Sequence, residues 1–226
     1  MAAENNFATD KIKTSEGDIA ITFIRHATLM ISFNEKIIHI DPVSEYADYS
    51  KLPKADLILV THEHHDHFDP KAIQAIKTDK TELVITQTIA KQNVDGIVMK
   101  NGDKKVVQGI QIEAVPAYNL VHMRSPGVPY HPRGFGNGYI ITLGKKRIYI
   151  AGDTENIPEM KNLESIDIAF LPMNLPYTMT PEMVADAAKS FRPKILYPYH
   201  FGETNVQKLV ELLKGENIEV RIREMN

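Results

Sequence analysis

The chain of 226 residues contains no cysteine. This absence excludes disulfides, thiolate zinc sites and cysteine nucleophiles, so any tight transition-metal site must be built from histidine and carboxylate side chains. A reducing compartment fits the absence, and we therefore expect a cytoplasmic protein. Export of a processed precursor is the alternative.

The sequence also lacks a large charge excess and a long apolar run. Its 26 lysines and arginines against 29 aspartates and glutamates give a net charge of −3, which argues against a dedicated nucleic-acid binder. No stretch approaches the ~18 apolar residues of a membrane span, and residues 1–14 lack the apolar core of an export signal. We expect neither a nucleic-acid partner nor a membrane.

What the sequence does contain is a regular succession of strand and helix signals. No linker or repeat interrupts it, so we predict one domain over residues 1–226, with residues 1–15 as a flexible extension. β-Branched and aromatic runs predict strands, and capping signals before helically spaced apolar residues predict helices. The strands are expected at 19–24, 28–33, 36–40, 56–60, 83–86, 104–108, 110–116, 138–143, 147–151, 166–171, 194–197 and 218–222. The helices are expected from 69–70 onward, over 181–190 and over 204–214.

Two groups of strands, each followed by helices, define the predicted architecture. We expect an α/β (α+β) fold built as a four-layer αββα sandwich, in which two mixed sheets lie face to face and the helices cover their outer faces.

A dense group of histidines and acids follows one predicted strand, where residues 61–67 read Thr-His-Glu-His-His-Asp-His. Alternate residues of an extended segment point to one side, so His62 and His64 can direct two imidazoles at one ion. Where the chain turns into the next helix, Asp66 and His67 face a neighbouring position. A histidine-rich surface loop is the alternative, but clustered imidazoles favour a divalent metal.

The spacing His62-x-His64-x-Asp66-His67 after a short apolar strand resembles the signature of the metallo-β-lactamase superfamily. Further parts of that pattern follow in order, namely Ile40-Asp41-Pro42, Gly152-Asp153-Thr154 and Pro198-Tyr199-His200. The small size, with His26-Ala27 and Pro158-Glu159-Met160, makes the chain most similar to small metal-dependent hydrolases such as L-ascorbate-6-phosphate lactonase.

This resemblance implies a metal-dependent hydrolase with two divalent cations, Zn²⁺ or Mn²⁺. Six side chains are implied as ligands: His62 and His64 for the first cation, Asp66, His67 and His200 for the second, and Asp153 between the two. Asp41 would lie behind a ligand histidine and orient it, as outer carboxylates commonly do.

One segment departs from the family pattern, because Asn119 stands where a further histidine of the first cation is expected. Four outcomes are open: a weak first site, a site ligated by Asn119, a site completed by water, or replacement by His131, His122 or His26. For His26 the alternative is an ordinary turn or core residue. His39, within a strand, is expected to be structural or on the surface, and His65 is expected to face solvent.

The segment 119–138 is long and carries His122, Arg124, His131 and Arg133. Loops of this length are frequently lids or binding loops. A lid whose histidine and arginines contact an anionic substrate therefore competes with a plain Pro/Gly-rich surface loop.

Two cations roughly 3.5–4 Å apart would lower the pKa of a shared water from about 15.7 to about 7. We expect Asp66 to orient the resulting hydroxide and His131 to protonate the leaving group. The leading hypothesis is hydrolysis of a small molecule, a lactone or phosphorylated sugar-acid derivative, by a monomer or a homo-oligomer. The alternatives are a phosphodiesterase or nuclease, which the net charge disfavours, and a catalytically silent metal-binding protein, which Asn119 suggests.

Overall fold

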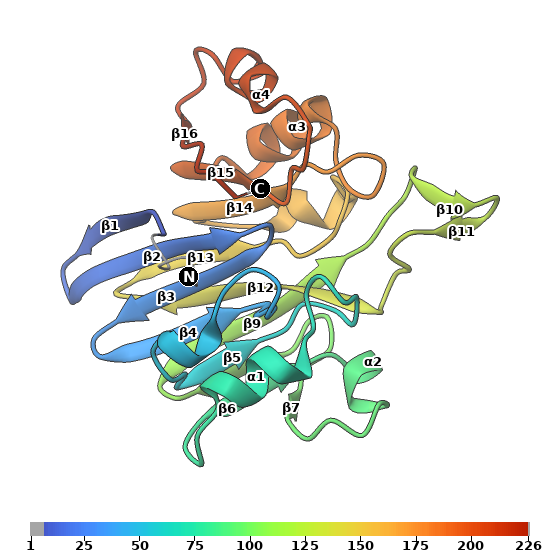
Figure 1. The fold of residues 1–226 in the computed structure, drawn as a ribbon. Helices are drawn as coiled ribbons and strands as arrows, with labels where there is room; N and C mark the ends of the chain where they lie inside the picture. The colour runs from blue at the N-terminus through green and yellow to red at the C-terminus, as the bar shows by residue number, and fades with distance from the viewer. Residues whose placement is uncertain (1–6, 226) are drawn as a thin grey trace.

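Two seven-stranded sheets dominate the computed structural model, which describes residues 7–225 (Figure 1). The first sheet has the order β1-β2-β3-β4-β5-β6-β7 and the second β16-β15-β14-β13-β12-β9-β8. The strands of the first sheet are β1 (Thr9–Thr14), β2 (Gly17–Arg25), β3 (Thr28–Phe33), β4 (Lys36–Ile40), β5 (Leu57–Leu59), β6 (Glu82–Ile85) and β7 (Ile97–Val98). Those of the second are β8 (Lys104–Val107), β9 (Ile110–Ala117), β12 (Gly136–Leu143), β13 (Lys146–Ile150), β14 (Ile168–Pro172), β15 (Ile195–Tyr199) and β16 (Glu219–Val220).

The remaining elements are short. The helices are α1 (Pro70–Ile76), α2 (Gln87–Ala90), α3 (Pro181–Phe191) and α4 (Val206–Leu212), and the 3₁₀ turns are η1 (Tyr49–Lys51) and η2 (Pro158–Asn162). The strands β10 (Met123–Ser125) and β11 (Val128–Pro129) form a separate hairpin that extends away from the body of the protein (Figure 1). Within the described residues, no helix has both the length and the apolar composition to span a membrane.

Both sheets are mixed. In the first, β1 to β4 pair antiparallel and β4 to β7 pair parallel. In the second, β8, β9, β12 and β13 pair antiparallel, whereas β13 to β16 pair parallel. Parallel neighbours end at the same edge, so the segments after β4 and β5 and those after β13 and β15 emerge together.

An apolar core joins the two sheets. On β2, Ile19, Ile21 and Phe23 are buried at alternate positions, as expected for a strand with one face on the core. The Phe23 ring lies 5.0 Å from the Tyr197 ring of the second sheet, between centroids, and Phe170 stacks on Tyr197 at 5.1 Å. Aromatic packing of this kind adds about 0.5–1.5 kcal/mol per pair beyond burial.

The helices cover the outer faces and complete the four predicted layers. Asp69 caps α1 and Pro70 opens it, as predicted, and the buried side of this helix packs on the first sheet. Thr180 caps α3, whose Phe191 ring lies 5.9 Å from Tyr149 of the second sheet. The predicted αββα sandwich is therefore confirmed.

Two expectations about irregular segments were wrong. Residues 9–14 of the expected flexible extension form β1, in which Ile12 pairs with Ile19, while residues 1–6 lie outside the described chain. Within 119–138, the β10–β11 hairpin turns at Gly127, whose φ of +76° suits glycine. Strand β10 is exposed, and β1 alternates between exposed and half-buried residues of which only Ile12 is apolar, so neither shows the apolar alternation that reveals a half-buried strand.

Candidate metal centre

Histidines and aspartates from distant segments converge at one edge of the two sheets. Asp41 follows β4, residues 61–67 follow β5, Asp153 follows β13 and His200 follows β15. Three groups have donor atoms within 4.8 Å of one another: His62, His64 and His131; His26, Asp66, His67 and His200; and His62, His67 and Asp153. The strand order thus brings together side chains that are up to 174 residues apart, from His26 to His200.

The first group consists of three imidazoles. Nε2 of His62 lies 3.1 Å from Nδ1 of His64, and the two rings meet edge to face. The His131 ring lies 5.3 Å from that of His62 and 5.0 Å from that of His64, between centroids. His131 therefore lies beside the two histidines that the sequence pattern assigns to the first cation.

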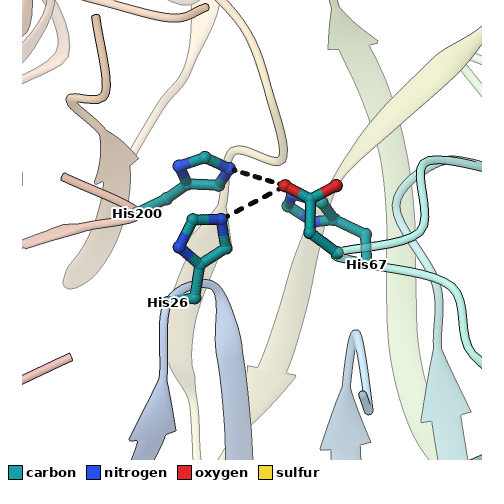
Figure 2. Close-up of side chains that lie close together, drawn as sticks. His26, His67 and His200 are labelled. Atoms are coloured by element: carbon teal, nitrogen blue, oxygen red, sulfur yellow. Dashed lines mark hydrogen bonds and ion pairs between the residues drawn. The ribbon is translucent and has the colours of Figure 1, made fainter. Parts of the chain in front are cut away.

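The second group gathers around the carboxylate of Asp66. Its Oδ2 lies 3.2 Å from Nε2 of His26, 3.6 Å from Nε2 of His200 and 3.8 Å from Nε2 of His67. In Figure 2, His26 comes from the turn between β2 and β3, His67 from the loop after β5 and His200 from the end of β15, and the three side chains approach one another. Three imidazoles and one carboxylate thus share one side of the centre.

Asp153 lies between the two groups. Its Oδ2 lies 3.1 Å from Nε2 of His131 and 3.3 Å from Nε2 of His200, whereas its Oδ1 lies 3.4 Å from Nε2 of His67. The carboxylate is almost fully buried. It therefore faces both sets of imidazoles, as the sequence pattern anticipates.

Hydrogen bonds on the side away from the centre orient two candidate ligands, His67 and His62. Nδ1 of His67 donates to Oδ2 of Asp41 at 2.8 Å, which leaves Nε2 directed into the centre. The Thr61 hydroxyl donates to the same carboxylate at 2.7 Å and accepts from Nδ1 of His62 at 3.0 Å. Hydrogen bonds of this kind fix the tautomer and the ring orientation of metal-binding histidines. Asp41 thus lies where the sequence predicts it.

Asn119 orients His131 and is directed away from the donor groups. Its Oδ1 accepts from Nδ1 of His131 at 2.6 Å and from the backbone N–H of His131 at 3.0 Å. Its amide nitrogen donates to Glu155 and to the carbonyl of Tyr177. Of the four outcomes left open at Asn119, the geometry agrees with replacement by His131.

Glu155 is a buried residue that the sequence reasoning missed. Its carboxylate accepts from the backbone N–H groups of Leu120, Val121 and His122 at 2.6–2.7 Å. It therefore anchors the start of the loop that carries His131. The only available signal was its place two residues after Asp153.

The electrostatics of the centre are set by its carboxylates. Burial disfavours the imidazolium of His200, but the charge of Asp153 and the neighbouring carboxylate of Asp66 raise its pKa to about 10. Burial likewise opposes ionisation of Asp153, yet His200 and His67 hold its pKa well below the usual value. For His62, burial and then the charge of His67 lower the pKa. Positive charge is thus favoured between the carboxylates.

The donor set fits divalent cations. Three buried polar atoms that face the centre have no hydrogen-bond partner among the described residues: Nε2 of His67, Oδ1 of Asp153 and Nε2 of His200. An unsatisfied buried polar atom costs about 1–3 kcal/mol. Imidazole and carboxylate are ordinary ligands of Zn²⁺ and Mn²⁺, and cations here would satisfy these atoms while displacing protons from the histidines.

The three predicted substrate-loop residues, Arg124, Arg133 and His122, lie in different surroundings. Arg124, on β10 of the hairpin, lines a cavity of about 380 Å³ next to the donor groups. Arg133 instead lies on the exterior, 2.6 Å from Glu159, and Nδ1 of His122 lies 2.8 Å from Glu155. Neither residue lines that cavity, and their contact with a substrate stays a prediction. His65 is exposed, as predicted.

Comparison with known proteins identifies the family. A family model described as the beta-lactamase superfamily domain matches residues 20–200, which is most of the chain. The chain belongs to the metallo-β-lactamase superfamily. It is 30% identical over 194 residues to a UPF0173 metal-dependent hydrolase from Pelotomaculum thermopropionicum, covering 80% of this chain and 84% of that protein. A UPF0173 metal-dependent hydrolase from Thermococcus kodakarensis is 33% identical over 198 residues, covering 81% and 85%.

Solved structures agree with this assignment. A candidate metal-dependent hydrolase from Parabacteroides distasonis is 53% identical, with a TM-score of 0.93, and covers 97% of this chain and 100% of that one. A metallo hydrolase from Ignicoccus hospitalis is 25% identical, with a TM-score of 0.75, and covers 92% and 96%. The predictions of the superfamily and of a metal-dependent hydrolase are confirmed. The link to lactonases stays a prediction.

Proposed function

We propose that the protein is a binuclear metal-dependent hydrolase of a small anionic substrate, a lactone or a phosphorylated sugar-acid derivative. The observation that carries the proposal is the convergence of two donor groups on the buried carboxylate of Asp153. In this arrangement, one cation is held by His62, His64 and His131 and the other by Asp66, His67 and His200, with Asp153 between them.

Bound cations of this kind supply an activated water and a Lewis acid for the substrate oxygen. Asp66, less buried than Asp153, would orient the water. In hydrolysis of a lactone, the water oxygen bonds to the acyl carbon, the ring C–O bond breaks, and the proton ends on the released hydroxyl. Because Nδ1 of His131 bonds Asn119 and its Nε2 faces Asp153, we propose this histidine as a ligand in place of the general acid expected from the sequence.

The size of the neighbouring cavity favours a small substrate. Its volume of about 380 Å³ lies within the range of small-molecule pockets, about 300–1,000 Å³. A polymeric nucleic acid needs a basic surface for its phosphates, and the chain has a net charge of −3. The nuclease alternative is accordingly disfavoured.

One cationic side chain of the cavity wall, Arg124, favours an anionic group on the substrate. Arg124 is the one lysine or arginine among the described residues that line it, and no carboxylate among those residues pairs with this guanidinium. Arg124 lies over the Tyr130 ring at 5.9 Å, and Tyr130 packs on Tyr177 at 5.0 Å, so one aromatic wall positions the arginine. A guanidinium on such a wall suits a carboxylate or phosphate.

The silent metal-binding alternative loses its main support. It rested on Asn119 in place of a ligand histidine, but His131 lies beside His62 and His64 and Asn119 orients it. A complete donor set removes the reason to expect an impaired first site.

A substrate panel with metal-loaded protein tests the proposal. We expect hydrolysis of lactones, fastest for lactones that carry a phosphate or carboxylate, and slow hydrolysis of bis(p-nitrophenyl) phosphate. Faster turnover of the phosphodiester would favour the phosphodiesterase alternative. Turnover of neither ester class by protein that contains two cations would favour the silent alternative.

A further inference from the structure

Among the described residues of the centre, His26 is the one potential metal ligand without a role so far. The other seven are the six ligands implied by the sequence and His131. His26 lies in the turn between β2 and β3, and its Nε2 belongs to the same group of donor atoms as Asp66, His67 and His200. It is 3.2 Å from Oδ2 of Asp66. In Figure 2, dashed lines join the rings of His26 and His200 to one carboxylate oxygen, Oδ2 of Asp66, which lies 3.8 Å from Nε2 of His67.

The backbone of His26 is built to keep the side chain in this place. Its φ is +55°, a left-handed conformation that costs a residue with a Cβ about 1–2 kcal/mol. The N–H of His26 donates to the carbonyl of Met225 at 2.6 Å, and its carbonyl accepts from the N–H of His200 at 2.9 Å. The turn that carries His26 is therefore hydrogen-bonded directly to the backbone of His200, a proposed ligand. Strained backbone held by such bonds is concentrated at functional sites.

The ring is fixed on two sides. It packs on the His200 ring at 3.7 Å between centroids and lies 5.6 Å from the Tyr46 ring. The side chain is only 20% exposed. A ring with so little freedom presents Nε2 to the centre without a large loss of side-chain entropy when it binds a ligand.

Two roles are compatible with a distance of 3.2 Å between Nε2 and Asp66: a hydrogen bond that orients Asp66, or a shared cation. A histidine that only orients Asp66 needs to approach that carboxylate alone. Nε2 of His26 instead lies within 4.8 Å of donor atoms of His67 and His200 as well, and these come from two other segments. Convergence of several donors on one point is the arrangement that a cation requires.

We propose that His26 is a ligand of the second cation. This inference rests on the proposed function, and it gives the two positions different donor sets. The second cation would have three imidazoles, Asp66 and Asp153, whereas the first would have three imidazoles and Asp153. A borderline cation such as Zn²⁺ or Co²⁺ suits this imidazole-rich set.

Two substitutions separate the roles. Asparagine tolerates a positive φ, so His26→Asn keeps the turn but is too short to reach the centre. His26→Gln keeps an N–H that can donate a hydrogen bond to Asp66, but it replaces the imidazole by an amide, which is a weak metal ligand. His65→Gln removes an exposed histidine from the same motif and is the matched control.

The experiment is a stepwise titration of metal-free protein with Co²⁺, followed by visible absorption and by competition with a chelator. We expect two cations in the wild type and in the control. Both His26 variants should lose more than the ~100-fold in affinity that an outer hydrogen-bond partner contributes, at one cation only, with an altered visible band.

The outcomes distinguish the claims. Wild-type affinity in His26→Gln but not in His26→Asn would show that His26 only orients Asp66, and wild-type affinity in both would show no role at the metal. Either result overturns this inference and leaves the binuclear function intact. A wild type that binds fewer than two cations would overturn the proposed function itself. Thermal unfolding of the metal-free variants checks that the turn is folded.

Discussion

Two buried histidines, His39 and His200, show how neighbouring groups decide whether burial lowers or fails to lower the pKa of an imidazole. His39, on β4, is fully buried, and its side chain hydrogen-bonds, among the described residues, only the carbonyl of Pro53, at 3.1 Å through Nε2. Its burial lowers its pKa to about 4. His200 is equally buried, but the carboxylates of Asp153 and Asp66 overcome burial and raise its pKa to about 10.

The difference is the presence of buried carboxylates. Burial by itself expels positive charge, as at His39, whereas the centre is arranged to retain it. The structural role expected for His39 agrees with its place in the core. A site suits a cation when its surroundings favour positive charge and its potential ligand atoms have no hydrogen-bond partner.

The largest change should follow from removing the carboxylate that both donor groups share. In Asp153→Asn we expect kcat/KM to fall by at least about 1,000-fold, on the order of 4 kcal/mol, because the centre loses both a charge and a shared oxygen. Metal analysis and steady-state kinetics at saturating Zn²⁺ measure this. Far-UV circular dichroism controls for folding. Asp186→Asn, at an exposed carboxylate outside the centre that accepts from Asn156, should keep wild-type activity. Retention of more than a tenth of the activity would show that Asp153 is not the shared ligand.

His39 should make the fold sensitive to acid. Because its folded pKa is depressed, native protein stays neutral at this position while unfolded chain takes up a proton below pH 6.5. Its contribution is complete above pH 6.5, and about 3 kcal/mol of stability should be lost as the pH falls to 4. Urea unfolding of metal-free wild type and His39→Gln measures this. The variant should be less stable at pH 7 but show a shallower loss between pH 6.5 and 4, and equal slopes would contradict the assignment.

A smaller effect is expected from the side chain behind His131. Asn119→Ala removes the acceptor of Nδ1 of His131, so affinity for one cation should fall about 10–100-fold. Competition with a chelator measures it. Asn156→Ala, which removes an amide bonded to Asp186 outside the centre, is the matched control. Unchanged affinity in Asn119→Ala would refute the role of Asn119 in orienting His131 for metal binding.

The smallest effect concerns two arginines of one loop. Arg124 has no carboxylate partner among the described residues and lines the cavity, whereas Arg133 is paired with Glu159. Arg124→Ala should raise KM for an anionic lactone about tenfold, about 1.4 kcal/mol, with little change in kcat. A neutral lactone should be unaffected. Arg133→Ala should change KM less than twofold, and equal effects of the two substitutions would refute an anion site at Arg124.

Much of the fold could be predicted because its signals are local. Continuous apolar runs such as Leu57–Val60 and the capping pair Asp69-Pro70 lie within a few residues of the elements that they define. Strand β1 was not predicted, because its residues alternate between exposed and half-buried positions and give only a weak apolar pattern.

The candidate site divides in the same way. His62, His64, Asp66 and His67 share one short segment, and their spacing alone indicates a metal site. The part played by His131 could not be read from the sequence, because it depends on how the loop after β9 folds back. That path is set by Asn119 and by Glu155, whose buried carboxylate binds three backbone N–H groups.

Anomalous diffraction from crystals of protein purified without chelators tests the central claim most directly. Data collected at the zinc and manganese edges should show two cations, one beside His62, His64 and His131 and one beside Asp66, His67 and His200, with Asp153 in contact with both. A single cation at full metal loading, or Asp153 turned away from one of the two donor groups, would contradict the account.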